Sequence, residues 1–256
     1  MELETVLYKT NEGVAEISFN RPHVLNAQNR QLVKDFITAL KASENDPEVK
    51  VVIVKGEGRA FCSGDDLSEE YEDVTTTAQA LAEISRLQEI TRIILKMPKP
   101  VIAAVHGYAL GAGCEWCLNC DIRIAAQGTK FGFPETGVGF TVTNAGTKLL
   151  PLLVGLGKAK ELVFTGNKID AVEAEKLGLV NKVVLQEDLL KEAYALAERI
   201  KEKSQLSIAL SKHALHSGLT AGFDETLERE ARDALLAFQS PETSQRAKKA
   251  LKKTKK

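Results

Sequence analysis

The stretch KPVIAAVHGYALGAGCEWCLNCDIRIAA, residues 99–126, decides the fold of this chain. It opens with the apolar run VIAAV, which predicts a short strand buried on both faces. Glycines then lead into GAGCEWCLNC, which predicts a short helix, and DIRIAA predicts another strand. Strands and a helix that alternate within so short a segment are typical of the α/β class.

The residues before this stretch continue the alternation. VLYKT and VAEISFN, separated by the turn at residues 11–13, predict a β-hairpin, and VKVVIVKGEG predicts a further buried strand. Two amphipathic helices are expected, at residues 29–43 and 78–96, and Pro98 stops the second. The loop GEGRAFCSGDDL lies between this strand and the second helix.

The residues after the stretch become helical. From about Ala145 the periodicity predicts helices with one strand, LVNKVV, and three long helical stretches fall between Glu187 and Lys252. We therefore expect a βα core at residues 1–197 and a C-terminal helical region at 198–256, without a low-complexity linker between them.

Composition and charge narrow the class of protein. The 256 residues, 44% hydrophobic and 27% charged, favour a compact, enzyme-sized protein over a disordered or fibrous one. The 34 Lys and Arg residues nearly balance 35 Asp and Glu residues, so no global basic field indicates nucleic acid or an anionic membrane as partner. Neither a long apolar stretch nor a signal-peptide pattern is seen, and we expect a soluble, cytoplasmic protein without a membrane partner.

Three cysteines, Cys114, Cys117 and Cys120, have the C-x-x-C-x-x-C spacing of some iron–sulfur proteins. Asp121 follows the triplet where such motifs usually continue with C-P, and the only other cysteine, Cys62, is distant in sequence. Buried, reduced thiols explain the triplet better than a cluster does. We therefore expect no metal in the site.

The sequence lacks the motifs of zinc, serine-hydrolase and phosphate-loop sites. His213 and His216 lack the glutamate of an HExxH zinc pattern. No G-x-S-x-G elbow presents a nucleophilic serine, and the glycine runs at 56–58 and 107–113 lack the G-K-[S/T] of a phosphate-binding loop. Serine-hydrolase and phosphate-loop functions are disfavoured.

Two glutamates stand out by their surroundings. Glu115 lies in a segment apolar enough to be core, where an unpaired carboxylate would be costly. A structural partner, Arg123 or Lys130, is one explanation and a function is the other. Glu135 follows a proline in the segment KFGFPETGVG, where a solvated turn residue is equally reasonable. Separately, the two residues decide little.

Together, several segments resemble the crotonase (enoyl-CoA hydratase/isomerase) superfamily. Each matches a signature of that family, and they occur in the family's order across about residues 1–200. They are NRPHVLNA at 20–27, FCSGDDL at 61–67, the stretch at 99–126, FGFPETGVG at 131–139 and VFTGNKIDAVEAEKLGLVNKVV at 163–184.

The resemblance implies a fold and an assembly. We expect an α/β crotonase-like spiral of ββα units at 1–197 that binds acyl-CoA, and a C-terminal helical extension at 198–256 that builds a homotrimer or a dimer of trimers. Coenzyme A would be part of the substrate, so no separate cofactor is expected.

The resemblance also implies an oxyanion hole for the thioester. Two backbone N–H groups must point at the oxygen that becomes anionic, preferably at a helix N-terminus. By position these are the amides of Asp65 and Ala112, and Asp66 is expected to cap the turn that presents Asp65. The residues expected to contact substrate are His23, Val24, Leu25, Ser63, Gly64, Asp66, Leu67, Leu110, Gly111, Pro134 and Thr143.

Glu115 and Glu135 align with the two glutamates that hydratases of the family use. The resemblance therefore implies addition of water across the 2,3 double bond of a 2-enoyl-CoA, or the reverse dehydration. We expect Glu135 to be the acid that delivers the C2 proton and Glu115 the base toward water, although the sequence leaves a reversed or shared assignment open. Isomerisation, hydrolysis and carbon–carbon cleavage are the alternatives within the family. Isomerases often keep only the later glutamate.

The chain departs from the hydratase pattern G-x-x-P-G-x-G-G-T at residues 139–147, where it reads GFTVTNAGT. Thr143 and Asn144 add hydrogen-bonding groups that either contact a polar acyl group or, for Asn144, cap the next helix. Trp116 is either pocket wall or core. Acyl chain length and identity stay open.

A nucleic-acid function is the alternative from another class. The tail at 246–256 carries seven Lys or Arg residues, and some relatives bind RNA. The net charge of -1 and the absence of interleaved aromatic residues argue against it.

Overall fold

The computed structural model describes residues 2–69, 74–243 and 245–246. Its main sheet has the strand order β1-β2-β3-β4-β6-β9. The strands are β1 (Val6–Asn11), β2 (Val14–Phe19), β3 (Val51–Gly56), β4 (Val101–Val105), β6 (Ile122–Ala126) and β9 (Lys182–Val184). β1 and β2 pair antiparallel, and the other neighbours pair parallel. The expected hairpin and buried strands are confirmed.

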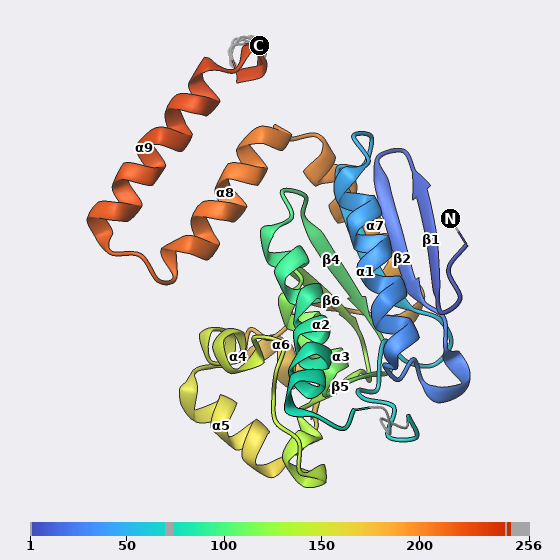
Figure 1. Cartoon of the computed structure of the whole chain (residues 1–256). Coiled ribbons are helices and arrows are strands. Elements are labelled where there is room, and N and C mark those ends of the chain that lie inside the picture. The colour runs from blue at the N-terminus through green and yellow to red at the C-terminus, as the bar shows by residue number, and fades with distance from the viewer. Residues whose placement is uncertain (1, 70–73, 244, 247–256) are drawn as a thin grey trace.

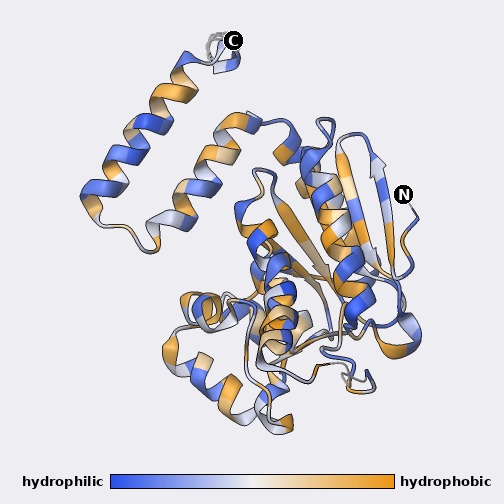
Figure 2. Ribbon diagram, in the orientation of Figure 1, coloured by the Kyte–Doolittle hydropathy of each residue, from blue (hydrophilic) through white to orange (hydrophobic). Residues whose placement is uncertain are grey.

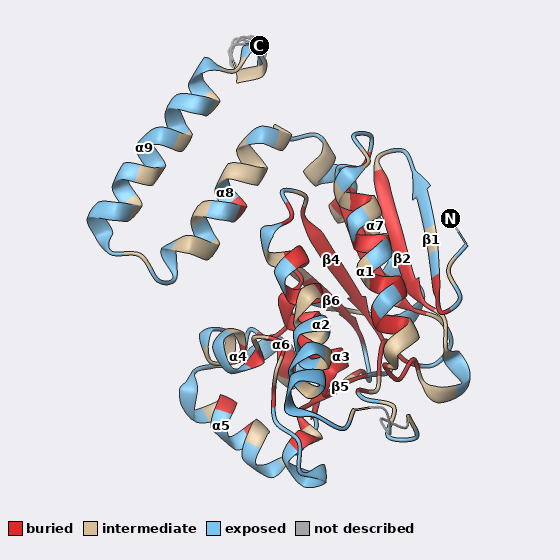
Figure 3. Cartoon of the chain, in the orientation of Figure 1, coloured by how far each residue is buried: buried red, intermediate tan, exposed pale blue. Residues whose placement is uncertain are grey.

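Helices cover both faces of this sheet, as parallel strands require. One face packs against α1 (Arg30–Asn45), α2 (Thr77–Lys96) and α3 (Ala112–Asn119), and the other packs against α7 (Leu189–Lys201). Figure 1 shows this layering. The strands β2 and β4 are buried along their whole length, and Figure 3 shows that burial is concentrated in the sheet and α3.

The helices α1 and α2 begin at residues whose side chains cap them. The side chain of Asn29 accepts a hydrogen bond from the Leu32 amide at 2.9 Å and caps α1. Thr76 and Gln79 form a reciprocal capping box that starts α2. Both helices lie within two residues of their expected bounds, because caps and periodicity are local signals.

A second, three-stranded sheet positions the later motifs. It consists of β5 (Tyr108–Leu110), β7 (Lys130–Gly132) and β8 (Ile169–Asp170). β5 and β7 pair parallel, so the start of α3 and the 3-10 turn Pro134–Val138 leave the same edge of this sheet. The sequence did not predict these strands, because strands of two or three residues have no periodicity to detect.

Trp116 belongs to the core. It is fully buried, and its ring centroid lies 5.3 Å from those of Phe19 and Phe36. Phe61 packs edge-on against Phe19, also at 5.3 Å. These rings join α1, α3, β2 and the loop after β3. The interpretation of Trp116 as pocket wall is wrong.

The chain is mostly helical from Gly146 onward, as expected. The helices are α4 (Gly146–Val154), α5 (Leu156–Thr165), α6 (Ala171–Lys176), α7, α8 (Gln205–Gly218) and α9 (Phe223–Gln239). In Figure 1, α8 and α9 stand away from the body, and Figure 2 shows hydrophobic positions along α9, which has no buried residue. α7 spans the expected boundary at 197, so the division into two domains stays a prediction. No helix within the described residues is long and apolar enough to cross a membrane.

Candidate active site

A cavity of about 590 Å³ lies where the loop after β3, α2, the start of α3 and the 3-10 turn Pro134–Val138 meet. Carboxylates from three of these segments line it together: Asp65, Glu115 and Glu135. The sequence predicted all three residues, from motifs spread over 70 positions. The lining also includes Ala112, Leu67, Asp66 and Thr143.

The two expected oxyanion-hole amides come from neighbouring backbones. Gly64, at φ +101°, precedes Asp65, and Gly111, at φ +53°, precedes Ala112. A Cβ atom on Gly64 would lie 3.1 Å from the Leu110 carbonyl oxygen, and one on Gly111 would lie 3.5 Å from the Gly64 Cα. The positive φ therefore favours glycine at both positions, and at Gly64 the close approach to the Leu110 carbonyl leaves little room for a Cβ as well. The contact brings the two amide-bearing segments together beside the cavity.

The Ala112 amide begins α3, whose first N–H groups have no partner within the helix. Within the described residues, neither the Asp65 amide nor the Ala112 amide donates to another backbone group. The Gly111 amide, in contrast, donates to the Gly132 carbonyl at 3.0 Å and ties α3 to β7. Both candidate donors are available to a ligand oxygen.

Glu115 is buried and held by the loop that follows Glu135. Its Oε1 accepts hydrogen bonds from the Thr143 amide at 2.6 Å and the Asn144 amide at 3.3 Å. Its Oε2 accepts from Asn144 Nδ2 at 2.6 Å. Burial raises the pKa of Glu115, and these hydrogen bonds oppose the increase.

The hydrogen-bond partners of Glu115 are Thr143 and Asn144, not the predicted Arg123 or Lys130. The Arg123 guanidinium donates to the carbonyl oxygens of Leu179 at 2.7 Å and Cys120 at 2.6 Å. It thereby ties β6 to the end of α3 and the segment before β9. Pairing of Glu115 with Arg123 is wrong, because the guanidinium is used for backbone carbonyls.

Glu135 is buried too, but its carboxyl group lacks the hydrogen bonds that hold Glu115. Only 5% of the residue is exposed, and neither carboxyl oxygen has a hydrogen-bond partner in the described part of the chain. Burial, followed by the negative charges of Glu115 and Asp65, raises the pKa of Glu135 to about 7. A Cβ on Gly111 would lie 3.6 Å from its Oε1, so the carboxyl group lies beside the oxyanion-hole segment. The interpretation of Glu135 as a solvated turn residue is wrong.

Asp65 and Asp66 differ in their surroundings although they are adjacent. Asp65 faces the open cavity, accepts a hydrogen bond from the Gln28 side-chain amide, and has its pKa raised by desolvation. Asp66 accepts from the Ser68 amide and hydroxyl and pairs with Arg21 at 2.9 Å. These contacts hold the turn that presents the Asp65 amide.

The other expected substrate contacts form the frame behind the cavity. His23 and Val24 lie in a 3-10 turn, and Leu25 takes a left-handed φ of +55°. The Ser63 amide donates to the Leu25 carbonyl at 3.1 Å, which links this turn to the oxyanion-hole loop. None of His23, Val24, Leu25, Ser63, Gly64, Leu110, Gly111 and Pro134 is among the residues that line the cavity.

Sequence reasoning missed several lining residues. They come from the segment before α1, from α1 and α2, and from the loop before α4, and include Gln28, Arg30, Ile84, Leu87 and Phe140. Gln28 directly follows the motif NRPHVLNA, which was a usable signal. No sequence signal marked the α2 residues Ile84 and Leu87, because only tertiary packing turns the face of the helix that carries them toward the cavity.

The loop at 139–147 bears on the two hypotheses for Asn144. The residue before α4 is Ala145, at a left-handed φ of +60°, and no side chain caps the helix. Asn144 is buried, is not among the cavity-lining residues, and donates to Glu115. The expectation of a helix cap is wrong for Asn144, and contact of its side chain with the acyl group stays a prediction.

All four cysteines are buried. Burial raises the pKa of the Cys62 and Cys117 thiols to about 12, and Cys120 Sγ donates to the Trp116 carbonyl at 3.3 Å. The described residues contain no group of three or more His, Cys, Asp and Glu side chains that could hold a metal ion.

Known proteins share this fold and sequence. The model of the enoyl-CoA hydratase/isomerase family matches residues 9–255. A crotonyl-CoA hydratase of Syntrophomonas wolfei is 41% identical, and a short-chain-enoyl-CoA hydratase of Clostridium acetobutylicum 40%, each over 90% of this chain and 88% of the relative. A solved enoyl-CoA hydratase of Bacillus anthracis aligns with a TM-score of 0.91 at 31% identity, over 98% of this chain and 97% of that one. The expected fold class is confirmed, and the chain belongs to the enoyl-CoA hydratase/isomerase family of the crotonase superfamily.

Proposed function

We propose that this protein is an enoyl-CoA hydratase that adds water reversibly across the 2,3 double bond of a 2-enoyl-CoA. The observation that carries the proposal is the pair of buried carboxyl groups, Glu115 and Glu135, in one cavity with two available backbone amides. The expected activity agrees with the names of the relatives that match nine-tenths of the chain.

The thioester carbonyl oxygen would accept hydrogen bonds from the Asp65 and Ala112 amides. Addition of water at C3 moves negative charge onto this oxygen, and donors aimed at a developing charge stabilise the transition state more than the ground state. The Ala112 amide adds the positive end of the α3 dipole. Glycine at 64 and 111 lets the thioester approach both amides closely.

The two glutamates would divide the proton transfers. Glu115 accepts three protein hydrogen bonds, which favour its ionised form and suit it as the base that deprotonates the water. Glu135, with a pKa raised to about 7, keeps a proton near neutral pH and suits delivery to C2. Water supplies the hydroxyl at C3, and the reaction needs no oxidant or reductant.

Turnover of a panel of CoA thioesters tests the activity. Short, long, branched and aromatic 2-enoyl-CoA substrates should lose the absorbance of the conjugated thioester as water adds. Formation of 2-enoyl-CoA from 3-enoyl-CoA would instead indicate an isomerase. No turnover of any 2-enoyl-CoA would overturn the hydratase proposal.

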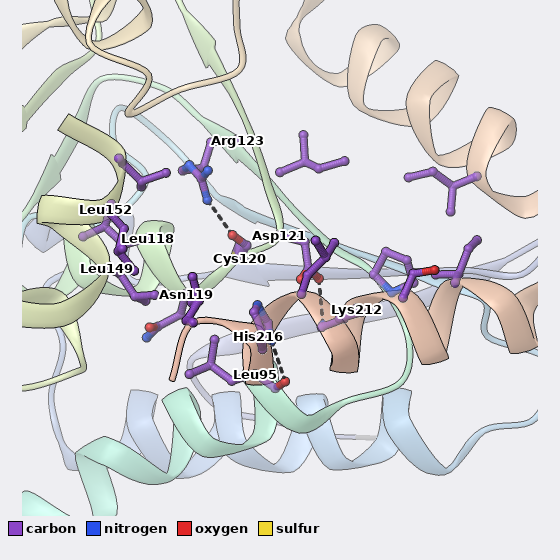
Figure 4. Close-up of a pocket in the computed structure, with 18 of the residues that line it drawn as sticks. Leu95, Leu118, Asn119, Cys120, Asp121, Arg123, Leu149, Leu152, Lys212 and His216 are labelled. Atoms are coloured by element: carbon purple, nitrogen blue, oxygen red, sulfur yellow. Dashed lines mark hydrogen bonds and ion pairs between the residues drawn. The ribbon is translucent and has the colours of Figure 1, made fainter. Parts of the chain in front are cut away.

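The surface of α8 and α9 supports the expected homotrimer or dimer of trimers. A cavity of about 730 Å³ opens between α8 and the body, and Figure 4 shows Lys212 reaching across to Asp121 at 2.7 Å. Leu152, Leu215 and Phe223 are more than half exposed nearby. Exposed apolar patches on helices commonly mark protein interfaces.

Native mass spectrometry tests this assembly. A mass three or six times the 27.9 kDa of one chain is expected, and Leu215→Glu should weaken it. A monomer at micromolar concentration would contradict it. Cytoplasmic location stays a prediction, and residues 247–256 of the basic tail lie outside the described residues.

A further inference from the structure

Asn144 has an unusual environment for an amide side chain. It is 1% exposed, and its Nδ2 donates to Glu115 Oε2 at 2.6 Å. Its Oδ1 is buried without a hydrogen-bond partner among the described residues. A buried carbonyl oxygen left unpaired costs free energy, so this side chain is not explained as a source of stability.

The orientation of the amide follows from the carboxylate. The opposite orientation would place Oδ1 against Glu115 Oε2, two acceptors within 3 Å and no hydrogen between them. Only the donating orientation is compatible with an ionised Glu115. An ionised Glu115 therefore fixes the orientation of the Asn144 amide.

The three donors to Glu115 leave little of its carboxylate unused. A carboxylate has about four lone-pair positions. Oε1 takes the Thr143 and Asn144 amides, and Oε2 takes Asn144 Nδ2, so about one position, on Oε2, is left. Because backbone donors are present whatever the side chains are, Asn144 Nδ2 is the contact that this sequence adds.

We propose that Asn144 is a positioning residue: its side-chain amide holds Glu115 ionised, with a single lone pair left for the attacking water, and so fixes Glu115 as the base. This role rests on the proposed function. The counterpart acid is then Glu135, which has no such donor.

Charged groups of both signs line the cavity beside Glu115. The Asp65 carboxylate disfavours ionisation of Glu115, whereas Glu135, as the protonated acid, adds no negative charge. The other charged side chains of the lining are Asp66, Glu69, Glu83, Arg30 and Arg86. Cys114, the preceding residue on α3, stays a neutral thiol because burial raises its pKa well above the ordinary value. Loss of the Asn144 donor would raise the pKa of Glu115 further.

The test combines Asn144→Ala with Asn144→Asp. Asn144→Ala removes the donor, and kcat should fall roughly tenfold to a hundredfold with KM nearly unchanged. Because the base must be ionised, the acid limb of kcat/KM should move to higher pH, by about one pH unit. Asn144→Asp keeps the shape of the side chain but places an acceptor or a charge beside Glu115. A role in filling space predicts near-normal turnover for Asn144→Asp, whereas the positioning role predicts a loss in both variants.

Asn119→Ala is a matched control on the same helix as Glu115. Asn119 is also 1% exposed, donates through Nδ2 to Thr91 Oγ1 at 2.8 Å, and has an unpaired, buried Oδ1. It contacts no residue of the active-site cavity through these atoms. Asn119→Ala should lower the melting temperature but leave the acid limb where it is in the wild type.

A readout without turnover separates this proposal from the hydratase proposal. Infrared or carboxyl-carbon NMR titration of the substrate-free protein, with the Glu115 signal assigned by its loss in Glu115→Gln, reports ionisation directly. A higher Glu115 pKa in Asn144→Ala supports the positioning role even if no enoyl-CoA is hydrated. An unchanged Glu115 titration in both Asn144 variants, or an unmoved acid limb in an active Asn144→Ala, would overturn it.

Discussion

Replacement of Glu135 by Gln tests both the chemistry and the electrostatics of the site. Gln has nearly the same shape but cannot deliver a proton. If Glu135 is the general acid, turnover should fall about a hundredfold to ten-thousandfold, while binding of a CoA thioester is retained. Glu115→Gln should lose a similar factor, and the double variant should lose little more than the worse single variant, because the two act as a unit.

The pKa of Glu135 sets the pH dependence. The acid must carry its proton, so kcat/KM in the wild type should fall above about pH 7 as Glu135 ionises. At pH 8 roughly a tenth of the protein would be protonated at this position. Glu135→Gln should lose this alkaline limb together with its activity.

The same shift predicts a gain in stability for the inactive variant. The folded pKa lies above the ordinary value of 4.5, so the folded protein binds more protons between these values, and its stability decreases as the pH rises from 4.5 to about 7. The difference corresponds to about 3 kcal/mol at and above pH 8. Glu135→Gln removes this cost, so its melting temperature should exceed that of the wild type at pH 8 but not at pH 4.

The assays are enoyl-CoA hydration from pH 5 to 9, binding of a non-reacting CoA thioester by calorimetry, and thermal unfolding at both pH values. Near-wild-type turnover in both glutamate variants would refute the catalytic assignment. A large loss in Glu135→Gln with a small one in Glu115→Gln would indicate an isomerase. No gain in stability at pH 8 would refute the electrostatic account of Glu135.

Three further predictions concern the frame of the site. Asp65→Ala should keep substantial turnover, because the backbone amide of that residue and not its carboxylate is the proposed donor to the thioester. The alkaline limb should move to lower pH, because a negative charge near Glu135 is lost. An inactive but folded variant would show that the carboxylate itself is used. Ala112→Pro removes one backbone donor at the first helical position, where proline is tolerated. It should reduce kcat about a hundredfold or more, whereas the control Ala112→Gly should not. Equal kcat values in the two variants would argue against this donor. Cys117→Ala should lower the melting temperature but preserve turnover, because the thiol is core, and loss of activity in a folded variant would contradict this.

Local sequence patterns were sufficient for most of the secondary structure. The hairpin, the strands β3 and β4 and the helices α1 and α2 follow from periodicity, caps and turn residues, which act over a few positions. The strands β5, β7 and β8 were missed because each has three residues or fewer and exists only through pairing with distant segments.

Many residues of the candidate site could also be predicted from the sequence. Residue type and motif spacing determined which residues to examine: Asp65, Ala112, Glu115 and Glu135 all lie at the cavity that the fold forms. Gly64 and Gly111 could be singled out from the sequence, because glycine adopts the positive φ that both positions have at no steric cost. The sequence by itself therefore determined the family, the core strands and helices, and the candidate donors and carboxyl groups.

Only the tertiary structure decided how the two glutamates differ. Asn144 lies 29 residues from Glu115 in sequence, and the loop that carries it must fold over α3 before its amide can reach the carboxylate. Glu135 differs because no other residue of the described chain donates a hydrogen bond to its buried oxygens. Protonation depends on which groups lie within a few ångströms and on how much water is excluded, and neither quantity is encoded in local sequence. The two residues are the same amino acid, and their surroundings alone make one a hydrogen-bonded carboxylate and the other an acid with a pKa of about 7.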